Sequence, residues 1–118
     1  MRLNPRNPAY LASYLTVLGE AYRLTGRNEE AITALKRALT LMPNLPGPHQ
    51  ILAIIYSEAG REEEARAEAE EILKVSPNFS LEGLRQRLPY KDPGEVERVL
   101  AALRKAGLKG VLRYFLEC

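Results

Sequence analysis

The chain has 118 residues, enough for one domain with a modest core, and its 46% hydrophobic and 27% charged residues are ordinary for a soluble globular protein. Its net charge of +2 is too small to indicate a nucleic acid or an anionic membrane as a partner. One histidine and one cysteine exclude a disulfide within the chain and the paired spacings of a metal site.

Other classes of function are excluded by what the sequence lacks. No glycine-rich phosphate loop and no Gly-x-Ser-x-Gly elbow is present, so we expect neither a cofactor nor catalysis. The longest apolar run, Ile51–Tyr56, is far shorter than the roughly 18 residues that span a bilayer. The chain opens without a basic-then-apolar leader, and the single cysteine, Cys118, favours a reducing compartment. The expected location is the cytoplasm.

Residues 1–11 are expected to be an N-terminal arm or the remnant of a preceding repeat. Leu3-Asn4-Pro5 resembles two later segments, Leu41-Met42-Pro43 and Val75-Ser76-Pro77. This likeness favours a unit upstream and a chain that is the C-terminal piece of something longer. A short native arm is the alternative.

The first predicted helix runs from about Pro8 to Thr25. Asn7 can cap it, and a proline at the first helical position suits the fixed φ of that residue. Leu18 and Tyr22 are four residues apart and therefore share one face.

The second predicted helix runs from about Asn28 to Leu41. Gly26 is placed where the first helix must end, because glycine accepts the left-handed conformation there. Glu29 and Glu30 follow at the start of the second helix, where acidic charge complements the helix dipole.

The second helix is expected to pack on the first through a small-large-small stripe. Ala31, Leu35 and Ala38 are spaced i, i+4, i+7 and face one side. Gly19 leaves room for close approach of the neighbouring helix, and Pro43 ends the unit.

This pattern returns once, 34 residues later. Ten identical residues recur at that spacing: Leu18, Tyr22, Gly26, Arg27, Glu29, Glu30, Ala31, Leu39, Pro43 and Asn44 become Leu52, Tyr56, Gly60, Arg61, Glu63, Glu64, Ala65, Leu73, Pro77 and Asn78. A fixed period of this length indicates stacked helical hairpins that cannot bury their apolar faces alone.

The repeat resembles the tetratricopeptide repeat, whose signature is Trp-x2-Leu-Gly-x2-Tyr, then Ala-x3-Phe, then Ala and Pro. The first unit supplies Leu18, Gly19, Tyr22, Ala31, Ala38 and Pro43, with Leu15 and Leu35 in place of the aromatics. The second supplies Leu52, Tyr56, Ala65 and Pro77, with His49, Ala69 and Ile72 at the other signature positions. The resemblance implies an all-α fold, a short α-solenoid of two helical hairpins (residues 12–45 and 46–79), and a role in protein binding.

The second unit differs from the first in the polarity of its helices. Its first helix begins at Pro46 or Pro48, ends near Ala59 and is apolar on nearly all sides, which predicts burial on more than one face. Its second helix, from about Glu62 to Val75, carries many glutamates on its outer face. We interpret that face as solvated, with an acidic docking patch as the alternative.

Residues 80–118 are expected to form a C-terminal helical cap, because a third unit fails to appear. Ser80 can cap a short helix to about Leu88, and Asp92 with Pro93 opens another that ends at Gly107. Its apolar stripe, Val96, Val99, Leu100 and Leu103, can cover Ile55, Tyr56, Ile72 and Phe79 of the last unit. Residues 111–116 are predicted to form a last short helix.

The cap also resembles the C-terminal ends of bacterial repeat proteins associated with class III adenylate/guanylate cyclases. The residues that carry this likeness are 77–81, 88–93 and 103–108. The resemblance implies a regulatory or scaffolding role in bacterial signalling, with the catalytic domain absent from this chain.

A partner groove can be located from helical geometry. In such stacks the first helix of each unit lines the concave side, and residues opposite Leu18 and Tyr22 face outward there. The expected groove residues are Thr16, Glu20, Arg23, Leu24, Gln50, Ile54, Ser57 and Glu58. Family members that clamp a terminal carboxylate use Lys and Asn at such places; here they hold Thr16, Glu20, Ile51 and Ile54, with only Arg85 as a remnant.

Three hypotheses of function follow. The first is an interaction module that binds a peptide or helix in this groove. Its alternative is a groove that is solvated and binds no partner. The second is the structural cap or oligomerisation end of a larger signalling protein; an enzyme or nucleic-acid binder is the third and least favoured. Because two units fall below the roughly three that a stack needs, we expect either a homo-oligomer or occupancy of the groove by the chain itself.

Overall fold

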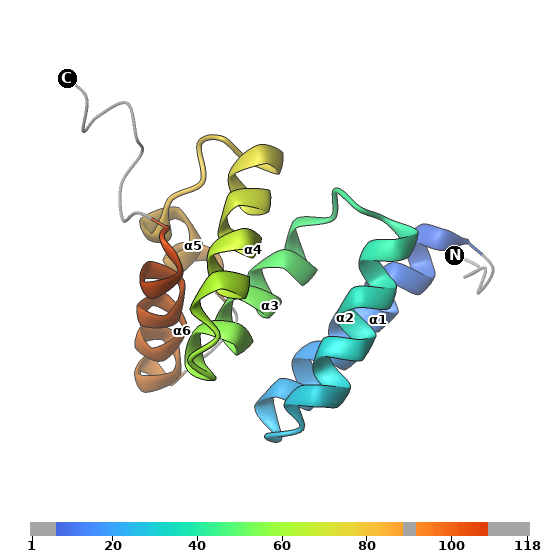
Figure 1. Cartoon of the computed structure of the whole chain (residues 1–118), viewed down its shortest axis with the longest axis horizontal. Helices are drawn as coiled ribbons and strands as arrows, with labels where there is room; N and C mark the ends of the chain where they lie inside the picture. Colours follow the sequence, from blue (N-terminus) through green and yellow to red (C-terminus); the bar gives the residue numbers. More distant parts are fainter. Residues whose placement is uncertain (1–6, 89–91, 109–118) are drawn as a thin grey trace.

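The computed structural model describes residues 7–88 and 92–108, and the described residues form six helices (Figure 1). Their bounds are α1 Pro8–Leu24, α2 Asn28–Leu41, α3 Pro46–Glu58, α4 Glu62–Val75, α5 Leu81–Arg87 and α6 Pro93–Ala106. The all-α prediction is confirmed. The predicted helix at 111–116 lies outside the described residues.

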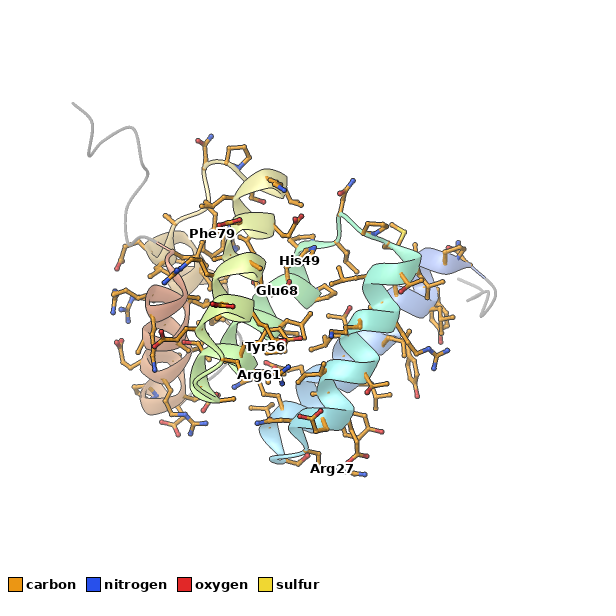
Figure 2. The ribbon with its side chains drawn as sticks, viewed as in Figure 1. Arg27, His49, Tyr56, Arg61, Glu68 and Phe79 are labelled. Atoms are coloured by element: carbon orange, nitrogen blue, oxygen red, sulfur yellow. The ribbon has the colours of Figure 1, made fainter. Side chains whose placement is uncertain are left out.

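The recurring residues build the same helix end twice. Gly26 and Gly60 have φ of 81° and 78°, as the position after a helix requires. The next residue in each unit, Arg27 or Arg61, donates its backbone N–H to the tyrosine carbonyl five residues earlier at 2.8 Å. The guanidinium carbon of Arg27 lies 4.9 Å from the centre of the Tyr22 ring, and that of Arg61 lies 4.7 Å from the centre of the Tyr56 ring, each a cation–π contact. Figure 2 labels the second pair.

Four further helix ends use the predicted caps. Asn7, Ser80 and Asp92 each accept a backbone N–H in the first turn of the following helix through a side-chain oxygen. Gly107 ends α6 with φ of 117°. These caps fix where α1, α5 and α6 begin. The short helix α5 and the longer helix α6 therefore follow unit two in place of a third full hairpin.

Each repeat unit is one antiparallel hairpin, α1 with α2 and α3 with α4, and the two stack because α2 packs on α3. Within the first hairpin the approach is close: a Cβ built on Gly19 would lie 2.6 Å from Leu35. The second hairpin has Ala53 and Ala69 at these places, both buried. In unit one the large side chain of Leu35 therefore fills the space that Gly19, which has no side chain, leaves open.

The C-terminal cap closes the far end of the stack. Helix α6 packs on α3, α4 and α5. Val99, Leu100 and Leu103 are at most 1% exposed and join the main core cluster, which also contains Ile55, Tyr56, Ile72 and Phe79. Val96 is half-buried against the same cluster. The cap thus replaces the third unit that the sequence lacks.

Candidate functional site

Four residues of the predicted groove lie on α1. Thr16 is half-buried and its hydroxyl donates to the carbonyl of Ala12 at 2.8 Å. Glu20 accepts from Nε of Arg23 at 2.7 Å. Arg23 is 7% exposed, whereas Leu24 is 52% exposed. Of these four residues, Leu24 alone has an exposed side chain.

The other four lie on α3, and most of them are covered. Ile54 is 4% exposed and Ser57 2%, while Gln50 is half-buried and Glu58, the last residue of the helix, is exposed. The hydroxyl of Ser57 is buried and has no hydrogen-bond partner within the described residues. Contact between a partner and Ile54 or Ser57 would require the covering side chains to move.

Helix α6 provides this cover. Arg23 donates from Nη2 to Glu95 at 3.1 Å, and Arg98 from Nε to Glu58 at 3.4 Å, so side-chain pairs link the first turns of α6 to the ends of α1 and α3. Ile54 shares the core cluster with the apolar stripe of α6. Ile54 and Ser57 are therefore buried within a single chain. Whether the chain self-associates or occupies its own groove stays a prediction.

Part of the groove remains open near the start of α3. A hollow of about 760 Å³ is bordered there by Gln50 and by the connection from α4 to α5. Thr16 lies beside it, since its methyl group is 3.3 Å from the place of a Cβ on Gly47, which lines the hollow. The polar side chains around it are Gln50, Ser76, Asn78, Ser80 and Arg87. Amides, hydroxyls and a guanidinium suit the polar groups of an extended peptide.

Arg85, which the sequence analysis interpreted as a remnant of a carboxylate clamp, pairs with glutamates of α5 and α6. It hydrogen-bonds Glu97 of α6 and lies 3.7 Å from Glu82. The hydrogen bond and charge of Arg85 lower the pKa of Glu97, and those of Arg61 lower the pKa of Glu64. These pairs are exposed and join helices or turns; they do not point into the groove.

His49 is a structural residue that joins the two units (Figure 2). Its Nδ1 is 2.6 Å from a carboxylate oxygen of Glu68, and its Nε2 is 3.1 Å from the carbonyl of Pro43. In unit one the residues that correspond to His49 and Glu68 are Leu15 and Ala34, so this polar contact is replaced there by an apolar pair.

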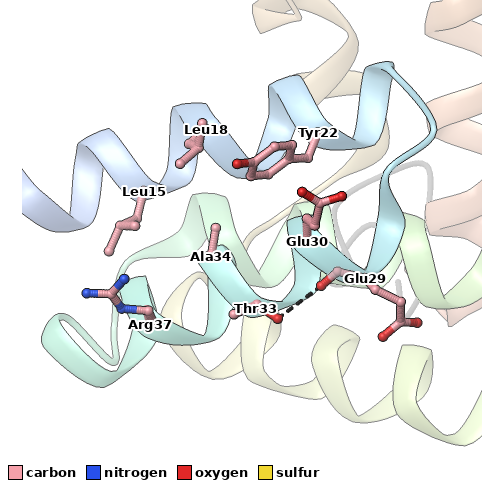
Figure 3. A pocket seen from close by; sticks show the side chains of 8 residues that line it. All are labelled: Leu15, Leu18, Tyr22, Glu29, Glu30, Thr33, Ala34 and Arg37. Atoms are coloured by element: carbon pink, nitrogen blue, oxygen red, sulfur yellow. Dashed lines mark hydrogen bonds between the residues drawn. The ribbon is translucent and has the colours of Figure 1, made fainter.

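A second hollow, which sequence reasoning did not find, lies between α1 and α2 (Figure 3). It has a volume of about 340 Å³ and a mainly apolar lining that includes Leu15, Leu18, Tyr22 and Ala34. The available signal was the 34-residue period, since Leu52 and Tyr56, the counterparts of Leu18 and Tyr22 in unit two, are core residues.

Among the described residues, no group of three or more His, Cys, Asp or Glu is placed to hold a metal ion. None of the described helices has the length and apolarity needed to cross a bilayer. What the two hollows offer is shape, apolar surface and hydrogen-bonding groups.

Comparison with known proteins agrees with the helical architecture. The family model described as tetratricopeptide repeat matches residues 22–88, more than half of the chain. The chain therefore belongs to the tetratricopeptide repeat family.

A stretch of 44 residues is also 46% identical to a protein named "Putative adenylate cyclase 3" from Rhizobium meliloti (strain 1021). It covers 37% of this chain and 8% of that protein. The chain thus spans a small fraction of this curated relative.

Proposed function

We propose that the chain is a protein–protein interaction module that binds a peptide or helix in the concave groove. Its family supports this class, since such repeats generally mediate protein–protein interaction. The groove residues are those named above on α1 and α3, of which Thr16, Glu20, Leu24, Gln50 and Glu58 have exposed or half-buried side chains.

The observation that carries the proposal is the way α3, which carries half of the expected groove residues, packs on α6. An amphipathic helix lies there with buried Val99, Leu100 and Leu103, and charged pairs fix its first turns. The groove is therefore complementary to an apolar helix stripe. Beside it, the open hollow at Gln50 offers polar contacts to a segment that need not displace α6.

The test uses a random peptide library selected on the immobilised full-length chain, followed by calorimetry with the peptides obtained. We expect Gln50→Arg to weaken their binding at least about tenfold, since it fills the hollow and adds charge. Arg37→Glu, on the opposite hollow, is the matched control and should leave binding unchanged. Peptides indifferent to Gln50→Arg, or no selected peptides at all, would contradict the proposal.

A second function is favoured by the match to the cyclase of Rhizobium meliloti. In this alternative the chain is the C-terminal structural cap or oligomerisation region of a larger bacterial signalling protein, located in the cytoplasm, with its catalytic domain elsewhere. Sedimentation velocity of the chain tests the oligomerisation part. A monomer at all concentrations would argue against it.

A further inference from the structure

The face of α1 turned away from unit two is apolar and exposed. Tyr14 is 55% exposed and Val17 70%, and Ala21 is exposed on the same stripe, at i, i+3 and i+7. The residues 34 positions later are covered to a greater extent: Pro48 is fully buried, Ile51 is half-buried and Ile55 is 1% exposed. The same helix position is thus core in unit two and surface in unit one.

In unit two this face is covered by a helix, α2. Helix α2 packs on α3, and its Ile32 is 7% exposed within the same core cluster as Leu52 and Tyr56. An ion pair adds to the contact, with Glu29 of α2 3.9 Å from Arg61. Helix α2 therefore covers α3 with an apolar side chain, Ile32, and with an acid, Glu29, near Arg61.

Unit one presents the receiving half of the same interface. Leu18 and Tyr22, the counterparts of Leu52 and Tyr56, are half-buried and border the hollow between α1 and α2 (Figure 3). Arg27 stands where Arg61 stands, with its ring contact to Tyr22 repeated. Its partner in the described residues is Glu30 of its own unit, as Glu64 is for Arg61.

We propose that this α1 face binds an amphipathic helix with the chemistry of α2, presented by a repeat unit other than the two described here. The occupant carries isoleucine or leucine at the places of Ile32 and Leu39, and an acid at the place of Glu29. The interface between α2 and α3 is the template for this contact, so its geometry already exists within the chain.

A second copy of the chain does not fit this description. The helix of a second copy that corresponds to α2 is α4, where Arg66 replaces Ile32 and Glu70 replaces Lys36. Both are exposed, and Leu73 is the one large apolar side chain of that set at 36% exposure. Repeat arrays end in polar outer faces of this kind, whereas α1 lacks one. This face is separate from the groove, so the proposal does not depend on the proposed function.

The experiment adds the occupant to the full chain. Residues 12–45 are duplicated directly before residue 12, which keeps the 34-residue register, and Cys118 is replaced by serine. The probe is the reactivity of a thiol in the original unit, Ala21→Cys, which is exposed now and whose counterpart Ile55 is buried. We expect thiol labelling to slow at least about tenfold in the tandem chain relative to the parent.

Two controls separate docking from other effects. Thr40→Cys, on the outer side of α2, should label equally fast in both chains. Ile32→Arg in the added copy should restore fast labelling of Ala21→Cys; unit two naturally has arginine there, so the unit still folds.

Three results would overturn the proposal. Labelling of Ala21→Cys could remain fast in the tandem chain, including the case in which the added unit stays unfolded by circular dichroism. It could slow equally with Ile32→Arg, which would remove the role of α2-like chemistry. It could already be slow in the parent in a concentration-dependent way, with a dimer in sedimentation, which would assign the face to a second copy.

Discussion

At the scale of single residues, the two units solve one packing problem differently. The first uses Gly19 against Leu35, and the second uses Ala53 against Ala69. The small-large exchange keeps the helices of each hairpin in contact although the individual residues differ. The sequence alone predicted the close approach at Gly19, but the coupling to Leu35 required the measured geometry.

This coupling can be tested by a double-mutant cycle. Gly19→Ala alone should destabilise the chain by about 1–3 kcal/mol, because the new Cβ would lie 2.6 Å from Leu35 and the core must shift. In the background of Leu35→Ala the same substitution should be neutral or stabilising, since alanine favours a helix over glycine by about 1 kcal/mol. Urea unfolding of the four proteins gives the result. Additive effects would show that the two sites are independent.

At the scale of elements, the links between helices were the least predictable part. Arg23 was expected in the groove, but it is buried between Glu20 and Glu95 and connects α1 with α6. Helical periodicity places a residue on a face; it does not reveal which distant helix covers that face. By contrast the helix starts at Pro8 and Pro93 and the positive φ of Gly26 were predictable, because caps and turns depend on neighbours in sequence.

Removal of the buried guanidinium should weaken the whole fold. Arg23→Ala leaves Glu95 without this partner in a half-buried site and should destabilise by about 3 kcal/mol. Arg27→Ala is the control, because Arg27 also bonds a glutamate but at an exposed site, where such pairs contribute little. Thermal unfolding should therefore show a large loss only for Arg23→Ala. Equal losses would indicate that burial of Arg23 has no energetic consequence.

The contact of α5 with α6 should be sensitive to acid. Arg85 holds the pKa of Glu97 below its ordinary value of 4.5, so the folded state binds this proton less readily than the unfolded state. The stabilisation is fully present above 4.5 and is lost as the pH falls below it. Glu97→Gln should reduce stability at neutral pH and flatten its decline in acid. Urea midpoints measured from neutral pH to below 4.5 decide this; parallel curves for the two proteins would contradict it.

At the scale of the whole molecule, the two ends of the stack differ in how far their apolar residues are covered. The C-terminal end is covered by α6, whose apolar stripe completes a core that two units cannot close. The sequence predicted this cap from four residues spaced along one helix face. It did not predict that the same helix would bury Ile54 and Ser57, because that depends on where α6 lies across α3.

The cap should therefore be essential for folding. Burial of Val99, Leu100 and Leu103 with the half-buried Val96 corresponds to roughly 5–10 kcal/mol before the entropy of ordering is subtracted, comparable with the net stability of a small domain. Leu100→Asp should abolish cooperative unfolding, since it places an unpaired charge at a site 1% exposed. Ala101→Asp, at the exposed neighbouring position, should unfold close to the wild-type temperature.

Truncation gives an independent test of the same idea. A chain of residues 1–88 keeps both repeat units but loses α6, so Ile55, Tyr56 and Ile72 become exposed to water. An exposed apolar surface of this kind favours aggregation or a molten state. We expect insoluble protein, or helical protein that binds a hydrophobic dye and melts without cooperativity. A soluble 1–88 chain that melts sharply near the full-length temperature would show that two units suffice and that α6 only occupies the groove.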